Sequence, residues 1–345
     1  LDASGTATAD IAAVMIGTTH FTNAVVERRR LQKTATIRIG LPATASLPPM
    51  VDWPDDLRTA IDGSANLVHG GHEFDGREIS KFDPGEVRAV VEAIASKGVK
   101  AVAISSVFSP VNPEMEVQAA AIVAEIIPDA DITRSAEIGR IGLLERENAA
   151  ILNSCLRRLA VETVTAFRNA ISEMGITAPL YLTQNDGTLM SADFADQYPV
   201  LTFASGPTNS MRGAAFLSGL KDAMVVDVGG TTSDVGALTH GFPREASVAV
   251  DIGGVRTNFR MPDVFSFGLG GGTMVQADPL KIGPQSVGYR ITEKALVFGG
   301  DTLTTTDIAV AAGIADIGDA SLVRHLDRAL ITAPMVRIQE MSETA

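Results

Sequence analysis

The chain has 345 residues, of which 46% are hydrophobic and 20% charged, so it can form a folded core and is not a disordered protein. Its formal net charge of −13 repels nucleic acids and anionic membrane surfaces, and neither is expected as a partner. No apolar stretch approaches the roughly 20 residues that span a membrane. The single Cys155 excludes a disulfide framework and favours a cytoplasmic location, and its apolar helical surroundings predict a buried thiol.

The first 200 residues alternate short β-rich runs with longer amphipathic segments. Strands that alternate with helices are the pattern of α/β proteins, so we expect an α/β domain here. The expected strands are 12–19, 33–40, 99–108, 130–138 and 178–184, and the expected helices are 20–31, 84–98, 112–127 and 143–175.

The pattern changes after residue 222, where β-like stretches follow one another with few helices between them, as in hairpins. Turn residues cluster over 184–206. The predicted boundary therefore divides an N-terminal α/β lobe, residues 1–200, from a second lobe, residues 201–345. The expected β-like stretches are 223–238, 245–259, 263–275 and 279–283, and helical pattern returns over 304–315 and 321–341.

Residues 224–238, MVVDVGGTTSDVGAL, predict a β-hairpin whose turn has no bulky side chain. Backbone N–H groups beside two glycines can come close to a phosphate, and two threonine hydroxyls add neutral donors. The flanking carboxylates can hold Mg²⁺ through water. The candidate phosphate-binding residues are Gly229, Gly230, Thr231 and Thr232, and the candidate metal-binding residues are Asp227 and Asp234.

An ordinary hairpin is the alternative interpretation of this stretch. In that case the glycines supply positive φ and the threonines fill strand positions, and spacing alone leaves both interpretations open. The stretch is not a P-loop, because GxxxxGK[ST] does not occur in the chain. It is not a dinucleotide-binding fingerprint either, because a strand and not a helix follows the glycines.

The stretch VVDVGGTTSDVG resembles the second phosphate-binding hairpin of the actin-like ATPase superfamily. More narrowly, the chain is similar to the hydantoinase A/oxoprolinase family, because four further stretches match that family in order along nearly the whole chain. The resemblance implies an α/β, two-lobed actin-like ATPase (ribonuclease H-like) fold with β-hairpins in the second lobe. The four stretches are GTTHFTNAVVERR (17–29), LYLTQNDGTLM (180–190), FASGPTNSMRGAA (203–215), and FGLGGGTMV with the IGPQSVG and TLTTTD that follow it (267–307).

The resemblance implies ATP and Mg²⁺ as cofactors, with the glycine run of the last stretch as a further part of the nucleotide site. Thr18 or Thr19 can cap the helix expected from His20, and the free N–H groups there, with Asn23, would orient a substrate. An ordinary helix cap is the alternative for that stretch. No catalytic base is identified. The residues of the glycine run are Gly270, Gly271 and Gly272.

One position departs from the family pattern, and a pair of histidines raises a separate question of metal binding. Many family members carry a His three positions before the glycine-rich stretch that begins at Gly268, where this chain has Phe265, and this departure weakens the prediction of a hydantoin or oxoproline substrate. His69 and His72 could share a metal, but no carboxylate or thiol partners stand at a fixed spacing from them, so a loop is the favoured interpretation.

The implied function is ATP-dependent hydrolysis, with ring opening, of a cyclic amide or imide such as a hydantoin or 5-oxoproline. Phosphorylation of the ring carbonyl oxygen would overcome amide resonance. The alternatives are an ATP-dependent ketone carboxylase subunit and a non-catalytic nucleotide-binding scaffold. A hydantoinase B-like partner subunit and an oligomeric state are expected. The first phosphate hairpin of the superfamily is absent from residues 1–200, so we expect a fragment that lacks both ends and full activity.

Overall fold

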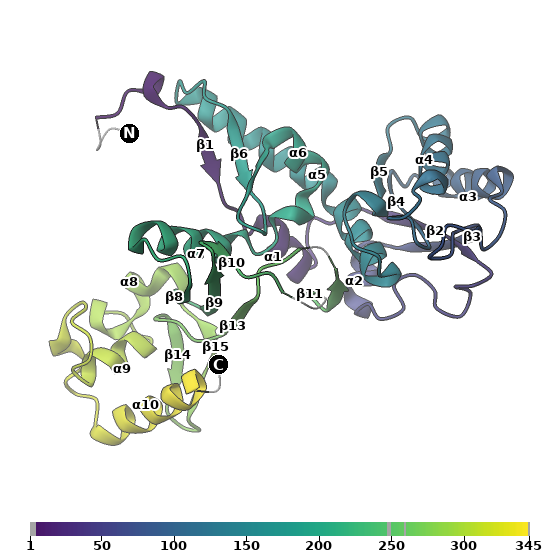
Figure 1. The fold of residues 1–345 in the computed structure, drawn as a ribbon. Helices are drawn as coiled ribbons and strands as arrows, with labels where there is room; N and C mark the ends of the chain where they lie inside the picture. The colour runs from purple at the N-terminus through teal and green to yellow at the C-terminus, as the bar shows by residue number, and fades with distance from the viewer. Residues whose placement is uncertain (1–4, 247–249, 259, 344–345) are drawn as a thin grey trace. The chain divides into compact units, whose positions relative to one another are not determined.

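The computed structural model describes residues 5–246, 250–258 and 260–343, which form two compact units (Figure 1). The chain passes from the first unit to the second inside helix α7 (Ser205–Ser218) and returns to the first unit once. None of the described helices is both long and apolar enough to cross a membrane. The first unit comprises Leu1–Asn209 and Glu245–Pro262, and the second comprises Ser210–Arg244 and Asp263–Ala345.

A four-stranded sheet of the first unit has all its strands parallel, in the order β3-β2-β4-β5. The central strands β2 and β4 are buried on both faces, as a parallel sheet with helices on each side requires. Figure 1 shows α3 and α4 side by side next to this sheet, and the long α5 contacts β4 and β5. The elements are β2 (Thr34–Leu41), β3 (Ser64–His69), α3 (Pro84–Ser96), β4 (Ala101–Ser106), α4 (Glu114–Ile126), β5 (Asp131–Arg134) and α5 (Leu143–Glu173).

Alternate residues of β2 serve the two faces of the sheet. Ile37 and Ile39 belong to an apolar cluster with Val91 of α3 and Ala119 of α4. Arg38, which lies between them in the sequence, contacts α5. The two-residue period of a strand therefore places aliphatic side chains under one pair of helices and a charged side chain under α5.

A buried ion pair joins α5 to the sheet. The guanidinium of Arg38 donates two hydrogen bonds to the carboxylate of Glu147, at 2.7 and 2.5 Å. The hydroxyl of Ser105 donates a third, at 2.6 Å. The two charged side chains are at most 1% exposed, so the geometry and the extra hydrogen bond must offset the cost of removing both charges from water.

A second buried network involves the residue before Glu147. Arg146 donates to the hydroxyl of Ser135 and to the carbonyl of Ser106. Glu116 of α4 accepts from the backbone N–H of Ser106 at 2.9 Å and from the hydroxyl of Ser135 at 2.6 Å. Burial raises the pKa of the Glu116 carboxyl and lowers the pKa of the Arg146 guanidinium, and the hydrogen bonds oppose the first of these shifts.

A second sheet of the first unit pairs β1 with β6 in parallel and β6 with β7 in antiparallel orientation. Because β1 and β6 are parallel, the loops that follow them leave the sheet at the same edge. Phe21, Leu156 and Phe203 belong to the core cluster beside this sheet. The remaining elements of the unit are β1 (Val14–Ile16), α1 (His20–Val26), α2 (Asp55–Ala60), β6 (Leu180–Thr183), β7 (Leu189–Ser191), α6 (Ala192–Gln197), β11 (Val250–Ile252) and β12 (Val255–Thr257).

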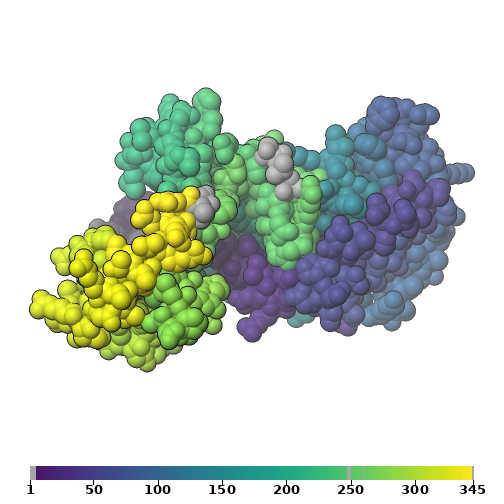
Figure 2. Space-filling view, turned by 90° about the horizontal axis from the view of Figure 1, so that it is seen from below, coloured from purple at the N-terminus to yellow at the C-terminus, as the bar shows by residue number. Residues whose placement is uncertain are grey.

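The second unit is built from antiparallel hairpins and short helices. Strand β9 pairs with β8, β10 and β13, and β14 pairs with β15. Helix α10 lies at the surface of this unit, in yellow in Figure 2. The elements are β8 (Ala223–Val228), β9 (Ser233–Thr239), β10 (Phe242–Pro243), β13 (Val264–Phe267), β14 (Thr273–Gln276), β15 (Lys281–Ser286), α8 (Ile291–Lys294), α9 (Thr305–Ala311) and α10 (Arg328–Glu343).

Most of the predicted elements are present, and the long helix expected over 143–175 is confirmed as α5. Cys155 lies in it, and burial raises the pKa of its thiol, as predicted for a buried residue. The helix expected over 20–31 ends earlier, at Val26. Strand β3 and helix α2 were not predicted. In the predicted stretch 245–259, residues 247–249 and 259 lie outside the described residues.

Replacement of Glu147 by Ala is expected to destabilise the chain strongly, by about 3–5 kcal/mol, because Arg38 would remain buried without a counter-charge. Urea unfolding at equilibrium measures this loss. Glu162, on the same helix, forms only exposed ion pairs, so Glu162→Ala is the matched control and should have a small effect. Equal losses for the two variants would contradict the assignment.

Replacement of Glu116 by Gln is expected to remove a pH-dependent part of the stability. Because the pKa of Glu116 is raised above 4.5 in the folded chain, its stabilising contribution is complete below pH 4.5 and is lost as the pH rises through the raised pKa. The difference in thermal unfolding midpoint, wild type minus variant, should therefore fall as the pH rises above 4.5.

Glu125 provides a control of opposite sign on the same helix. Its exposed carboxylate accepts a hydrogen bond from Arg88, which lowers its pKa. The difference in thermal unfolding midpoint, wild type minus Glu125→Gln, should rise slightly with pH. A rising difference for Glu116→Gln would show that the hydrogen bonds to Glu116 outweigh its burial.

Candidate functional site

The turn between β8 and β9 consists of residues 229–232, as predicted, and all four residues are exposed. The N–H of Gly229 donates to the carbonyl of Thr232 at 2.9 Å and closes the turn. Within the described residues, the N–H groups of Gly230, Thr231 and Thr232 have no acceptor. Three successive free N–H groups in an exposed turn form the kind of donor set that binds an anion.

The glycines of the turn do not serve left-handed backbone. Neither Gly229 nor Gly230 has a positive φ, so the reason that the ordinary-hairpin interpretation gave for them is wrong. The close backbone contact requires glycine at Gly270 and Gly272, on the segment that packs against the turn. A Cβ at Gly270 would lie 2.5 Å from the carbonyl oxygen of Gly229, and one at Gly272 would lie 2.8 Å from that of Gly230.

The glycine run therefore lies against the turn, backbone to backbone. The N–H of Gly271 donates to the carbonyl of Gly229 at 3.0 Å, and the N–H of Gly272 donates to that of Gly230 at 2.7 Å. Gly270 and Gly272 are buried in this contact. The structure thus gives the run a supporting role beneath the turn, and its predicted role in binding the nucleotide remains a prediction.

The start of α9 supports the glycine run from the other side. The hydroxyl of Thr306 donates to the carbonyl of Gly271 at 2.8 Å, and the hydroxyl of Thr305 lies within hydrogen-bond distance of the carbonyls of Gly270 and Gly271, at 2.5 and 3.0 Å. A capping box between Thr304 and Asp307 fixes the first turn of this helix. The predicted TLTTTD motif therefore acts on the hairpin turn through the glycine run.

Asp227 and Asp234 lie directly opposite each other in the β8–β9 register, so their carboxylates share one face of the sheet. Both are half-buried, and Ser266 of β13 donates a hydrogen bond to Asp234. Neither carboxylate has an ion pair within the described part of the chain. Two neighbouring carboxylates without a counter-ion suit a cation, so these residues fit the predicted Mg²⁺.

The described residues contain no group of three or more His, Cys, Asp and Glu side chains that could hold a metal. The ring of His69 contacts the carboxylate of Glu86, and the ring of His72 contacts the amide of Asn112.

Phe265 lies on the opposite face of this sheet from the two carboxylates. It pairs with Val235, one position away from the Ser266–Asp234 pair, so its side chain points the other way. It is 51% exposed and stacks on Phe267 at a ring distance of 5.9 Å. A His at this position in relatives would therefore not join Asp227 and Asp234 as a ligand.

In the first unit, the predicted substrate residues follow the carboxyl end of β1. Thr19 is the N-cap of α1 but makes no side-chain cap bond; instead, the hydroxyl of Thr18 accepts from the N–H of His20 at 3.1 Å. Asn23 lies one turn into α1 and is exposed. Thr18 thus bonds the first N–H of the helix from the position before the N-cap, and the substrate role of the three residues remains a prediction.

Three of the family-like stretches meet around this loop. The hydroxyl of Ser205 donates to the carbonyl of Thr18 at 3.0 Å and accepts from its N–H at 3.3 Å. The hydroxyl of Thr208 donates to the carbonyl of Asn185, which follows β6. Ser205 and Asn185 are buried. Their contacts join residues far apart in the sequence and were not predicted, although each residue lies in a stretch that resembles the family.

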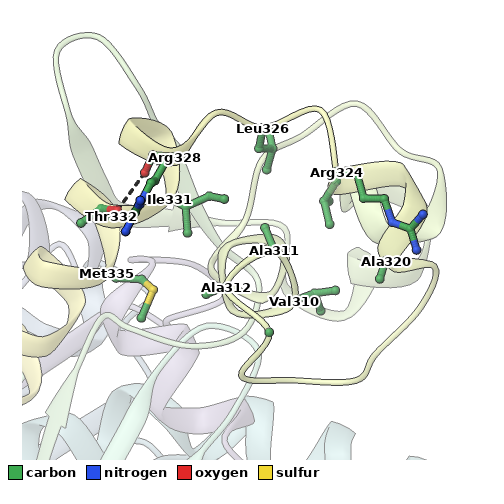
Figure 3. Close-up of a pocket in the computed structure, with 12 residues that line it drawn as sticks. Val310, Ala311, Ala312, Ala320, Arg324, Leu326, Arg328, Ile331, Thr332 and Met335 are labelled. Atoms are coloured by element: carbon green, nitrogen blue, oxygen red, sulfur yellow. Dashed lines mark hydrogen bonds between the residues drawn. The ribbon is translucent and has the colours of Figure 1, made fainter.

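A cavity of about 650 Å³ lies elsewhere in the second unit (Figure 3). Its lining comes from α9, the short helix Ala320–Val323 and α10, and it is mainly aliphatic with Arg324 and Arg328 at its sides. No residue of the hairpin turn or of the glycine run lines it. The cavity is therefore separate from the predicted phosphate site, whose donors lie on an exposed turn.

The fold is that of solved actin-like enzymes. The crystal structure of an ATP-dependent caprolactamase from Pseudomonas jessenii superposes with a TM-score of 0.72 at 24% identity, over 92% of this chain and 49% of that one. A nucleotide-free acetone carboxylase superposes with a TM-score of 0.65 at 19% identity, over 97% and 52%. These matches confirm the predicted actin-like α/β fold.

The chain belongs to the hydantoinase/oxoprolinase family. Residues 146–339 match the family model Hydantoinase/oxoprolinase, and residues 1–127 match the Hydantoinase/oxoprolinase N-terminal region, which confirms the resemblance seen in the sequence.

Two curated relatives show the range of the family. The alpha subunit of caprolactamase from Pseudomonas jessenii is 27% identical over 75% of this chain and 37% of its own length. The gamma subunit of acetophenone carboxylase from Aromatoleum aromaticum is 26% identical over 74% and 35%. The chain therefore aligns with little more than a third of these relatives.

Replacement of Gly270 by Ala is expected to cost about 1–3 kcal/mol of stability or more, because its Cβ would overlap backbone atoms of residues 229–231 that cannot move aside like a side chain. The matched control is Gly213→Ala in α7, where nothing lies within 4 Å and the helix should gain up to about 1 kcal/mol. Thermal unfolding compares the two. A neutral Gly270→Ala would mean that the turn and the run separate readily.

Proposed function

We propose that this chain carries the hairpin and substrate loops of an ATP-dependent enzyme that opens a cyclic amide or imide. One observation carries the proposal: within the residues that the structure describes, an exposed turn with three free N–H groups lies on the same hairpin as two carboxylates without an ion pair. Membership of the hydantoinase/oxoprolinase family and the caprolactamase relative support the reaction class.

In this proposal the hairpin binds both the phosphates and the metal ion of the nucleotide. The N–H groups of Gly230, Thr231 and Thr232 would receive phosphate oxygens, and Asp227 and Asp234 would hold Mg²⁺, directly or through water. ATP, when bound, would supply a phosphoryl group to the carbonyl oxygen of the amide. Fixed donors on a backbone that cannot reorganise would stabilise the charge that develops during transfer.

The loop that follows β1 would orient the organic substrate. Thr18 is held by Ser205 through two hydrogen bonds, so its position is defined before any ligand arrives. Thr19 and Asn23 are exposed beside it and present a hydroxyl and an amide, which suit the N–H and C=O groups of a cyclic amide. A hydantoinase B-like subunit, oligomer formation and a cytoplasmic location belong to the same proposal.

ATP-dependent carboxylation of a ketone is the second candidate. Acetophenone carboxylase and acetone carboxylase subunits are 26% identical to the chain, nearly the same as the caprolactamase subunit, and both reactions act on a carbonyl group. The exposed hairpin serves either reaction. The organic substrate and the need for bicarbonate separate the two.

The test measures phosphate release from ATP by the natural protein that carries this sequence, with any subunit that co-purifies. Hydantoin, 5-oxoproline and caprolactam are compared with acetone and acetophenone in the presence of bicarbonate. Stimulation by a cyclic amide, abolished by a Mg²⁺ chelator, is expected. Stimulation only by ketone and bicarbonate supports the second candidate, and ATP binding without any stimulated turnover supports a scaffold.

Asp227→Asn in the same protein should lower the stimulated rate by about 10- to 100-fold, as expected when a carboxylate that orients a metal or its water is lost. Asp222→Asn is the matched control, because Asp222 lies at the far end of the same hairpin and bonds only the N–H of His240 among the described residues. Equal rates for the two variants would exclude the assigned metal site.

A further inference from the structure

Ser286, at the end of β15, lies between the hairpin turn and the loop that follows β15. Its hydroxyl donates to the carbonyl of Gly230 at 2.9 Å and accepts from the N–H of Gly288 at 3.0 Å. It also lies 3.3 Å from the hydroxyl of Thr231. A serine hydroxyl has one proton and two acceptor positions, so these three contacts use its full capacity.

This arrangement determines which way the Thr231 hydroxyl points its proton. Ser286 has already given its only proton to Gly230, so Thr231 must be the donor in the contact between the two hydroxyls. The proton of Thr231 is then directed inward, and its free lone pair faces solvent. Thr232 differs, because its hydroxyl has no partner within the described residues and can still donate.

We propose that Ser286 is a positioning residue that makes the two threonines of the turn unequal toward a bound nucleotide. Thr231 meets the metal side of the ligand as an acceptor, to Mg²⁺ or to water bound to it, and Thr232 meets a phosphate oxygen as a donor. The inference rests on the proposed nucleotide site. It adds a residue outside the hairpin and assigns opposite hydrogen-bonding roles to adjacent identical side chains.

Ser286 also sets the direction of a peptide group. The carbonyl of Gly230 accepts from both Ser286 and the N–H of Gly272, so the peptide that carries the N–H of Thr231 is held in one orientation. That N–H is one of the three free donors of the turn. Loss of the Ser286 hydroxyl would leave one of these two bonds and release the hydroxyl of Thr231 to rotate.

The experiment measures the Kd of ATP with Mg²⁺ and with a chelator, by calorimetry on the natural protein that carries this sequence. The ratio of the two constants is the metal preference. Thr231→Val and Ser286→Ala should each lower the metal preference by about fivefold, the size of one hydrogen bond, and the double variant should lower it no further. Thr232→Val should weaken both forms of ATP equally and keep the ratio.

Controls separate this inference from a structural effect. Thr231→Ser keeps the hydroxyl and should restore the metal preference, and Ser342→Ala removes a serine hydroxyl from the exposed side of α10 and should change nothing. If Ser286→Ala does not fold, the Thr231 variants test the same contact from its other partner.

Three outcomes would overturn the inference. An unchanged ratio in Thr231→Val and Ser286→Ala, or an equal loss of ratio in Thr232→Val, removes the proposed inequality while ATP binding by the wild type keeps the proposed function. Absence of ATP binding by the wild type overturns both.

Discussion

The contact between two backbone segments without side chains is the constraint on which the second unit depends. The carbonyls of Gly229 and Gly230 receive the N–H groups of Gly271 and Gly272, at a separation that a Cβ at Gly270 or Gly272 would not permit. This contact fixes the hairpin turn from below and leaves its upper side open. An exposed loop would otherwise be mobile, and an anion site with mobile donors would lose much of its binding energy to ordering them.

The support extends outward from this contact in layers. Thr305 and Thr306 hold the carbonyl of Gly271, and the capping box of α9 holds those threonines. Ser286 holds the turn from the side. The sequence motifs that follow the hairpin are therefore best explained as a scaffold for it. Their glycine, serine and threonine residues are the types that permit close backbone approach and short hydrogen bonds.

The sequence predicted the hairpin and its Gly-Gly-Thr-Thr turn, because alternating apolar residues on both sides of this break leave little choice of register. It also predicted α5, whose pattern extends over many turns. It could not show that Gly270 and Gly272 are buried under the turn, since a long-range backbone contact leaves no local signal. Strand β3 was missed because its neighbour β2, and not its own composition, stabilises it. The contacts of Ser205 and Asn185 were missed because each joins residues that are distant in the sequence.

Two buried charged residues determine the position of helix α5 along the sheet. A helix that contacts a sheet only through aliphatic side chains can shift by small distances, because one apolar contact is exchanged for a similar one at modest cost. Here a guanidinium and a carboxylate, from consecutive residues Arg146 and Glu147, each fit a separate set of partners. A shift of one residue, about 1.5 Å along the axis and roughly 100° around it, would leave the charged side chains of Arg146 and Glu147 buried without their partners. The helix therefore has one position in which both buried charges find their partners, and intermediate positions satisfy neither.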